Sequence, residues 1–251
     1  MRSDGRWAVC SVIAVVLLAG AAEARAQGQS AESRWAVDVG IGIDPSINGN
    51  INSGAIGTLQ GQATAILPQS YGDVYGTGFE FHFGGGYKLD EYAELRGIFT
   101  FQSADADLVR LGDIGPSPLY AQYTDYKSLG LDLGYRRYFL PESRTIRPFG
   151  EIMAGAAFVD RINVQFAAPR ANVTFTSNDF FDATAAFTFS LNFGLLIKVG
   201  EQVDLTTQLG FRHVGQLSQV DQLVGTGLEK INDDTARLTF PIAVGLRYRF
   251  K

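Results

Sequence analysis

The fold of this chain is decided by residues 184–198, which read TAAFTFSLNFGLLIK. Apolar side chains occupy every second position from Phe187 to Ile197, and most positions between them hold small or polar residues such as Thr188, Ser190 and Asn192. Alternation with a period of two is the signature of a β-strand that has one apolar and one polar face. The stretch therefore predicts a long strand with unlike faces.

Seven further segments repeat this alternation. They are residues 34–44, 77–89, 92–103, 126–139, 146–160, 203–212 and 237–250. The connections between the eight segments alternate strictly between short and long. The short ones are residues 90–91, 141–145 and 200–202, and the long ones are residues 44–76, 104–125, 161–183 and 213–236. Outer-membrane barrels have this pattern of short periplasmic turns and long external loops, so we predict an all-β fold, an eight-stranded antiparallel up-and-down transmembrane β-barrel.

The bulk composition agrees with strands rather than helices as the membrane-crossing elements. The chain is 46% hydrophobic and 19% charged, and its mean hydropathy is only +0.03. After residue 26 it has no apolar run long enough for a membrane-spanning helix. A chain of this kind can enter a membrane only as a closed barrel, because backbone polar groups in lipid must be paired internally.

Residues 1–26 have the features of a secretory signal peptide. Arg2 and Arg6 provide a basic start, residues 8–22 are apolar, and Ala24-Arg25-Ala26 forms an A-x-A cleavage site. We therefore divide the chain into a signal peptide, 1–26, and an outer-membrane β-barrel domain, 27–251. The expected location is the cell outer membrane, with both the N- and the C-terminus in the periplasm.

On this register nearly all charged strand residues face the lumen, with Arg137 as the lipid-facing exception at the periplasmic boundary. The interior of an eight-stranded barrel is just wide enough for side chains to fill it, and unpaired charges there are costly. We therefore predict an ion-paired plug. Its members are Asp38, Glu94, Arg96, Asp132, Arg136, Glu151 and Arg247. The plug either only holds the barrel together or forms a gated path for ions and small solutes.

The C-terminal residues 245–250, Gly-Leu-Arg-Tyr-Arg-Phe, resemble the assembly signal of small outer-membrane β-barrel families, such as the transmembrane domain of outer-membrane protein A and its relatives. In that resemblance Gly245, Tyr248 and Phe250 are the signal positions, although Lys251 follows the expected terminal aromatic residue. The resemblance implies transient partners during biogenesis, the barrel-assembly machinery and periplasmic chaperones. It also implies outer-membrane lipids and lipopolysaccharide as the surroundings of the folded protein.

No catalytic or metal site is predicted. Residues 211–218 faintly resemble the His-x-Ser segment of lipid A deacylases, but Gly215 stands where the serine belongs, and Ser218 with Asp221 is a weak substitute. His82 beside Glu80 is interpreted as a hydrogen-bonded lumen residue. The one cysteine, Cys10, lies in the signal peptide, and two histidines are too few for a typical transition-metal site. We expect no cofactor and no enzyme activity.

The predicted function is that of an integral outer-membrane protein, structural or surface-interacting through its long external loops, and monomeric. The alternatives are a narrow channel for small or apolar solutes and a lipid A-modifying hydrolase. The net charge of −5 and the lack of a basic run argue against a nucleic-acid partner.

Overall fold

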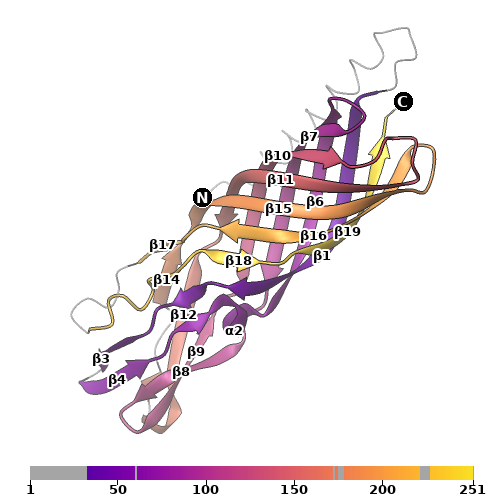
Figure 1. Ribbon diagram of the computed structural model, residues 1–251. Helices are drawn as coiled ribbons and strands as arrows, with labels where there is room; N and C mark the ends of the chain where they lie inside the picture. The colour runs from indigo at the N-terminus through magenta and orange to yellow at the C-terminus, as the bar shows by residue number, and fades with distance from the viewer. Residues whose placement is uncertain (1–32, 60, 172, 175–177, 221–226, 251) are drawn as a thin grey trace, which may run out of the picture.

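The computed structural model describes residues 33–59, 61–171, 173–174, 178–220 and 227–250. The predicted signal peptide, residues 1–26, lies outside the described residues. The described part is almost entirely β-structure and is elongated, with a barrel at one end and a second sheet at the other (Figure 1). None of the helices in these ranges is long and apolar enough to cross a membrane.

Eight antiparallel strands close the barrel, as predicted. In chain order they are β1 (Trp35–Asn48), β6 (Thr77–Lys88), β7 (Ala93–Ala104), β10 (Tyr126–Tyr138), β11 (Ile146–Val159), β15 (Thr184–Lys198), β16 (Val203–Val214) and a last strand in two pieces, β18 (Arg237–Thr239) and β19 (Ile242–Arg249). Each strand pairs with its neighbours in the chain order of the barrel, and β1 pairs with both β6 and β19, so that no edge is left in the wall.

The last strand is interrupted where the sequence predicts a continuous segment over 237–250. The break falls at Phe240 and Pro241, and a proline has no backbone N–H with which to continue the ladder. The wall is still joined there, because the Gly210 N–H donates to the Pro241 carbonyl (3.1 Å) and the Phe240 N–H donates to the Pro45 carbonyl (3.0 Å). The interruption is thus a local irregularity and not an opening.

The two faces of the wall are divided as the alternation predicts. On β15, Phe187, Phe189 and Leu191 are 40–59% exposed on the outside, whereas Thr188 and Ser190 are 2% exposed on the inside. The outward band is apolar, which suits contact with lipid, and the inward positions hold polar residues. A one-residue slip would exchange the faces of a whole strand, so the register is strongly specified.

The long connections do not remain loops, which corrects the expectation for residues 44–76, 104–125, 161–183 and 213–236. They form a second sheet with the strand order β17-β14-β12-β9-β8-β4-β3. Its strands are β3 (Ala55–Leu59), β4 (Gln62–Ile66), β8 (Leu108–Ile114), β9 (Ser117–Tyr123), β12 (Ile162–Ala168), β14 (Asn178–Asp182) and β17 (Ser218–Gln219), with β13 (Val173–Thr174) beside β12. We call this sheet the head, together with β2 (Asn50–Asn52), β5 (Gln69–Ser70), α2 (Tyr71–Tyr75), the short helix η1 (Pro169–Ala171) and residues 227–236.

The head folds because its strands bury apolar side chains of their own. Leu111, Leu119, Tyr123 and Ile162 are 0–2% exposed and belong to one continuous cluster of buried apolar residues. Burying such side chains stabilises a fold by about 1.5–3 kcal/mol each. The head is therefore a packed body on the end of the barrel, to which it is joined where β8 follows β7 and β10 follows β9 along the chain.

Helix α2 places aromatic residues over the end of the barrel. Ser70 caps the helix: its hydroxyl accepts from the Asp73 N–H, and the Asp73 carboxylate accepts from the Ser70 N–H, a reciprocal capping box. The helix buries Tyr71 and Tyr75, and the Tyr75 ring meets the ring of Tyr126, the first residue of β10, edge-on at 5.8 Å. The apolar core of the head thus reaches down to the barrel strands.

Candidate functional site in the lumen and the head

The lumen holds a group of ion pairs near the short turns, which we call the lower cluster. It consists of Asp38, Glu94, Arg96, Arg136, Glu151 and Arg247, all 6% exposed or less. Arg136 pairs with Glu151 through two nitrogens at 2.9 Å, Arg96 with Asp38 at 3.0 Å, and Arg247 with Glu94 at 2.7 Å. Three carboxylates therefore face three guanidinium groups.

The pairs of the lower cluster are linked to one another. Arg96 also lies 3.9 Å from Glu94 and 3.7 Å from Glu151. The Tyr138 hydroxyl donates to Glu94 at 2.8 Å and accepts from Arg247 at 3.1 Å. Because every member shares a partner, the cluster crosses the lumen as one network.

The structure brings six of the seven residues predicted for the plug into this network. The seventh, Asp132, lies elsewhere and accepts a hydrogen bond from the Thr188 hydroxyl. The aromatic rings that contact arginines in the same part of the lumen were not predicted from the sequence. The Arg136 guanidinium lies 3.8 Å from the centre of the Phe149 ring and that of Arg147 lies 3.9 Å from the Tyr138 ring.

A second polar group lies towards the head, and we call it the upper cluster. Its members are Asp44, Glu80, His82, Gln102, Arg212 and Arg237. Arg212 donates to Glu80, and His82 Nδ1 lies 3.5 Å from the other Glu80 oxygen. Gln102 donates to Asp44 and to Glu80, and Arg237 lies 3.9 Å from Asp44. His82 is thus a lumen residue beside Glu80, as its place in the sequence suggests.

The apolar core of the head lies directly above the upper cluster. The Arg237 guanidinium stacks 4.3 Å from the Tyr126 ring, which contacts Tyr75. Beyond them the Asp234 carboxylate accepts from the Tyr71 hydroxyl (3.1 Å) and the Leu217 N–H (2.9 Å). Burial raises the pKa of Tyr71 well above its usual value, and the neighbouring Asp234 raises this pKa further. Polar groups fill the lumen below, and packed apolar groups cover it above.

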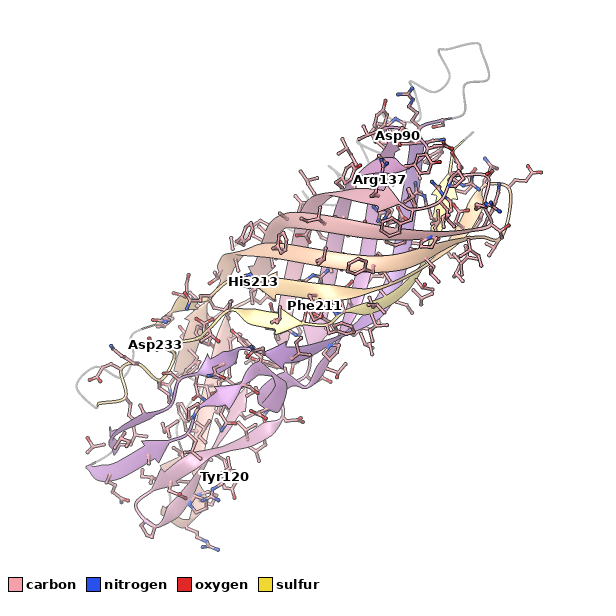
Figure 2. All side chains as sticks on the ribbon, in the orientation of Figure 1. Asp90, Tyr120, Arg137, Phe211, His213 and Asp233 are labelled. Carbon is pink, nitrogen blue, oxygen red and sulfur yellow. The ribbon has the colours of Figure 1, made fainter. Side chains whose placement is uncertain are left out.

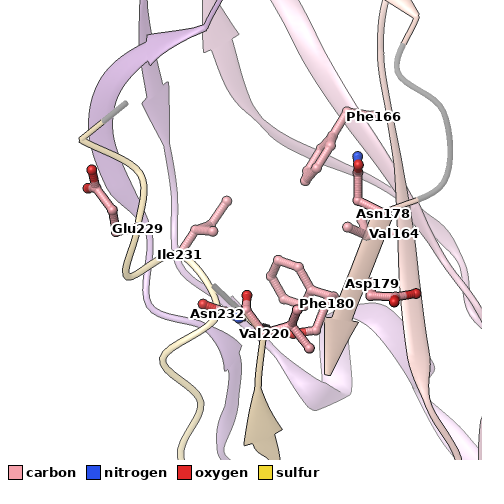
Figure 3. Close-up of a pocket in the computed structure, with 9 residues that line it drawn as sticks. All are labelled: Val164, Phe166, Asn178, Asp179, Phe180, Val220, Glu229, Ile231 and Asn232. Carbon is pink, nitrogen blue, oxygen red and sulfur yellow. Dashed lines mark hydrogen bonds between the residues drawn. The ribbon is translucent and has the colours of Figure 1, made fainter. Parts of the chain in front are cut away.

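The head contains one small hollow, shown in Figure 3. Phe166, Phe180 and Ile231 form its apolar walls, and the enclosed space is about 20 Å³. This volume is enough for one water molecule. The polar residues that line it already have partners: the Asn232 amide donates to the carbonyls of Phe180 (3.0 Å) and Val220 (2.9 Å), Asp179 accepts from Arg161 (3.1 Å), and Asn178 and Glu229 also have partners. The hollow is therefore a packing defect rather than a ligand pocket.

The residues considered for hydrolase chemistry lie apart in the fold. His213 is on β16 (Figure 2), two residues after the outward-facing Phe211, and Ser218 belongs to β17 in the head, where its N–H donates to the Thr184 hydroxyl (2.9 Å). Asp221 lies outside the described residues. Within the described ranges, no group of three or more His, Cys, Asp or Glu residues could hold a metal ion.

The proposed assembly-signal residues lie on and just after the last strand. Gly245 occupies an inward position of β19 opposite Gly40, and Tyr248 faces outward and meets the Phe250 ring at 5.2 Å. This places the two aromatic side chains at the end of the barrel that carries the short turns.

Comparison with known proteins places these features in a wider group. A family model described as outer membrane protein beta-barrel domain matches residues 12–250. Among solved structures, Neisserial surface protein A is 12% identical, covers 88% of this chain and 100% of its own, and has a TM-score of 0.44. The attachment invasion locus protein of Yersinia pestis, with a heparin analogue bound, is 10% identical. The match covers 86% of this chain and 99% of that protein's chain, with a TM-score of 0.36. The outer membrane protease OmpT from Escherichia coli is 10% identical. The match covers 89% of this chain and 99% of that protein's chain, with a TM-score of 0.42. No curated protein sequence matches the chain.

Proposed function

The chain belongs to the outer membrane protein beta-barrel domain family, and from this premise we propose that it is a closed outer-membrane barrel whose folded head interacts with the surroundings of the cell. The observation that carries the proposal is the head itself. Long connections that served only to join strands would need no common core, whereas these build one sheet around fully buried residues such as Leu111 and Leu119. A rigid body of this kind suits presentation of a binding surface.

The filled lumen supports a closed barrel rather than the narrow channel. The lower cluster crosses the lumen, and the head core covers its outer end. An ion that entered would have to separate buried ion pairs, which costs several kcal/mol when one partner is left alone. For the same reason we propose no solute path through the protein.

The proposed orientation puts the head outside the cell and the short turns in the periplasm. Figure 2 shows Asp90 and Arg137 at the end with the short turns, and Tyr120 and Asp233 on the head at the opposite end. β1 begins and β19 ends among the short turns, so both chain ends would be periplasmic. The outward apolar band would contact outer-membrane lipids and lipopolysaccharide, and the barrel-assembly machinery and periplasmic chaperones would act during biogenesis. We further propose that the protein is a monomer and not an enzyme.

The outer face of the head offers apolar side chains for contact. Ile56 is 84% exposed, Leu108 63% and Leu67 60%. Leu67 lies beside β8, because its N–H donates to the Leu111 carbonyl (2.6 Å). Ile56 pairs with Ala65 across β3 and β4, and β4 pairs with β8, which begins at Leu108, so the three large side chains come from neighbouring strands of the head.

The test compares cells that lack the gene with cells that express the wild type or a variant in which Ile56, Leu67 and Leu108 are all asparagine. We expect the wild type to increase cell aggregation or adhesion to cultured epithelial cells and polystyrene, and the variant, at equal surface amount, to lose this increase. Purified wild type in planar bilayers should show no stable open pore. Wild-type cells that adhere no better than cells without the gene, together with stable pores, would favour the channel instead.

A further inference from the structure

The lipid-facing side of the barrel carries a groove that runs across the strands. One wall is a row of outward side chains at paired positions: Phe79 pairs with Ile43, Ile43 with Ile242, Ile242 with Leu209, and Leu209 with Phe193. All five side chains are 45–49% exposed and line the groove. The groove therefore follows the direction of the hydrogen bonds between strands and not the strands themselves.

The opposite wall is the row of outward side chains two residues away on each strand. This wall is lower at Thr207 than at its neighbours. Ile41 pairs with Val244, Val244 with Thr207, and Thr207 with Leu195. Thr207 is the shortest of these side chains, and its hydroxyl is a polar group among apolar ones. Small inward residues, Gly42, Ala243 and Gly194, contribute the floor. The groove is open along its length, and the space that it borders is about 760 Å³, within the range of roughly 300–1,000 Å³ of small-molecule sites.

The groove descends through the membrane as it crosses the strands. Its lower end at Pro148, which lines the groove and pairs with Leu195, lies two residues from the start of β11 at Ile146, whereas Phe79 lies nine residues from the end of β6 at Lys88. Strands lie about 4.8 Å apart, so the five steps between these strands span roughly 24 Å. With strands tilted by about 40°, the groove descends roughly 15 Å, or half of the ~30 Å hydrocarbon core. This is the depth of one leaflet.

The lower end of the groove lies near a cation. Phe139 lines the groove there, and Arg137, the exposed arginine beside the short turns in Figure 2, precedes it by two residues at the end of β10. Within the described residues the Arg137 guanidinium lies 5.4 Å from the Tyr92 ring and has no ion-pair partner. A planar guanidinium at the membrane interface is suited to a phosphate group, to which it can donate two hydrogen bonds at once.

We propose that this groove holds an acyl chain of one glycerophospholipid of the inner leaflet, with the lipid phosphate bound by Arg137. The lining is apolar apart from Thr207 and Gln208, so it favours an apolar occupant, and in the membrane it faces hydrocarbon. The depth matches one leaflet, and the cation lies at the end where the headgroup of an inner-leaflet lipid is found. The choice of leaflet rests on the proposed orientation, with the short turns in the periplasm.

The test measures binding of dioleoyl phosphatidylglycerol to the detergent-purified barrel by native mass spectrometry. We expect one lipid per barrel in the wild type and at least tenfold weaker binding in Thr207→Phe, which fills the groove. The matched control is Ala154→Phe, which enlarges a small outward residue between Leu133 and Phe189 and should bind as the wild type does. Arg137→Gln should weaken phosphatidylglycerol binding about tenfold and leave binding of dioleoylglycerol, which has no phosphate, unchanged. A heat-modifiable gel shift verifies that each variant is folded.

Equal binding by Thr207→Phe and Ala154→Phe would overturn the groove as the binding site. A second experiment needs no variant: wild-type protein is photolabelled with phosphatidylglycerol that has a diazirine in its acyl chain. Adducts should concentrate on β16 and β19, and even labelling around the barrel would contradict the proposal. Lipid A binding in place of phosphatidylglycerol, lost in Thr207→Phe and in Arg137→Gln, would overturn the inner-leaflet assignment and the orientation. The lipid-binding and photolabelling results do not depend on whether the head binds a partner.

Discussion

Replacing Glu151 by glutamine should be among the most damaging single changes in the barrel wall. The Arg136 side chain is 0% exposed, and Glu151 is its ion-pair partner, in contact through two nitrogens at 2.9 Å. Glutamine keeps the shape of the side chain but removes the charge, so Arg136 would be left buried without the carboxylate that it contacts, and three guanidinium groups would face two carboxylates. Breaking a buried ion pair in this way costs about 3–5 kcal/mol, and we expect Glu151→Gln to lower the free energy of unfolding by that amount.

The partner variants separate charge from packing. Arg136→Met should cost less than Glu151→Gln, because Glu151 keeps Arg96 at 3.7 Å and a hydrogen bond from Asn192 at 3.2 Å. The double variant Arg136→Met, Glu151→Leu replaces the pair by apolar side chains of similar volume next to Phe149. Such replacements are often neutral or stabilising. The free energy of unfolding of the double variant should therefore differ from that of the wild type by no more than about 1 kcal/mol.

The assay is reversible unfolding by denaturant of the barrel in lipid vesicles, followed by tryptophan fluorescence. After residue 26 the chain has a single tryptophan, Trp35, at the start of β1, where its ring contacts Tyr87 at 4.9 Å. Asp113→Asn, which breaks the exposed pair with Arg110 (2.8 Å) in the head, is the control and should change little, because exposed ion pairs contribute little to stability. A decrease of less than about 1 kcal/mol in the free energy of unfolding of Glu151→Gln would refute the argument from charge burial. A double variant as unstable as Glu151→Gln would refute it as well.

Three further predictions concern packing, the head and pH. Gly194→Ala should destabilise the barrel by about 1–3 kcal/mol, because a Cβ there would lie 2.5 Å from the Phe149 ring, whereas Gly85→Ala, whose Cβ would have no neighbour closer than 3.6 Å, should be tolerated in the same denaturation assay. Tyr71→Phe removes the hydrogen bond to Asp234 and should cost about 1 kcal/mol in the head alone, seen as faster proteolysis of the head while the barrel keeps its gel shift; an equal loss in the barrel would contradict the separation. Burial raises the pKa of Tyr71 and Tyr75 well above the ordinary value near 10, so above about pH 10 the unfolded head ionises where the folded head does not, and head stability should fall as the pH rises. Ultraviolet titration of phenolate should show these two tyrosines ionising late, together with the unfolding of the head, and early ionisation of all tyrosines would contradict this.

The barrel could be predicted from the sequence because its strands obey one simple constraint. Lipid on one side and a polar lumen on the other impose a strict period of two, and the segment predicted at 184–198 coincides with β15. The closed topology followed from the alternation of short and long connections. The one break, at Pro241, comes from the missing N–H of proline, and a pattern of side chains alone does not register it.

The head was missed because its strands are short and obey a weaker pattern. Residues such as Val109 and Leu111 on β8, or Leu119, Ala121 and Tyr123 on β9, do alternate and point into the core. Each run is only seven residues long and is surrounded by Gly, Asp and Pro, which favour loops. A run of seven residues predicts a strand only when the strands that pair with it are known. In the head these come from other connections, far away in the chain.

The charged lumen was predicted in kind but not in every contact. Opposite charges on one face of neighbouring strands imply pairing, and this reasoning found the six residues of the lower cluster. It placed Asp132 in the same layer, whereas Thr188 on a different strand satisfies Asp132. Asp44 and Arg237 of the upper cluster stand at the ends of the predicted segments 34–44 and 237–250, where alternation no longer distinguishes lumen from loop.

Only two or three residues separate β7 from β8, β9 from β10 and β11 from β12, and these short junctions have a mechanical consequence. A load applied to the far side of the head acts along strands that run lengthwise into the membrane, so the hydrogen bonds between neighbouring strands are strained in shear and resist together. Bonds that are opened one after another, as in a zipper, yield at much lower force. A cell attached through such a head would therefore transmit tension from an outside contact to the wall of its membrane through junctions of two or three residues.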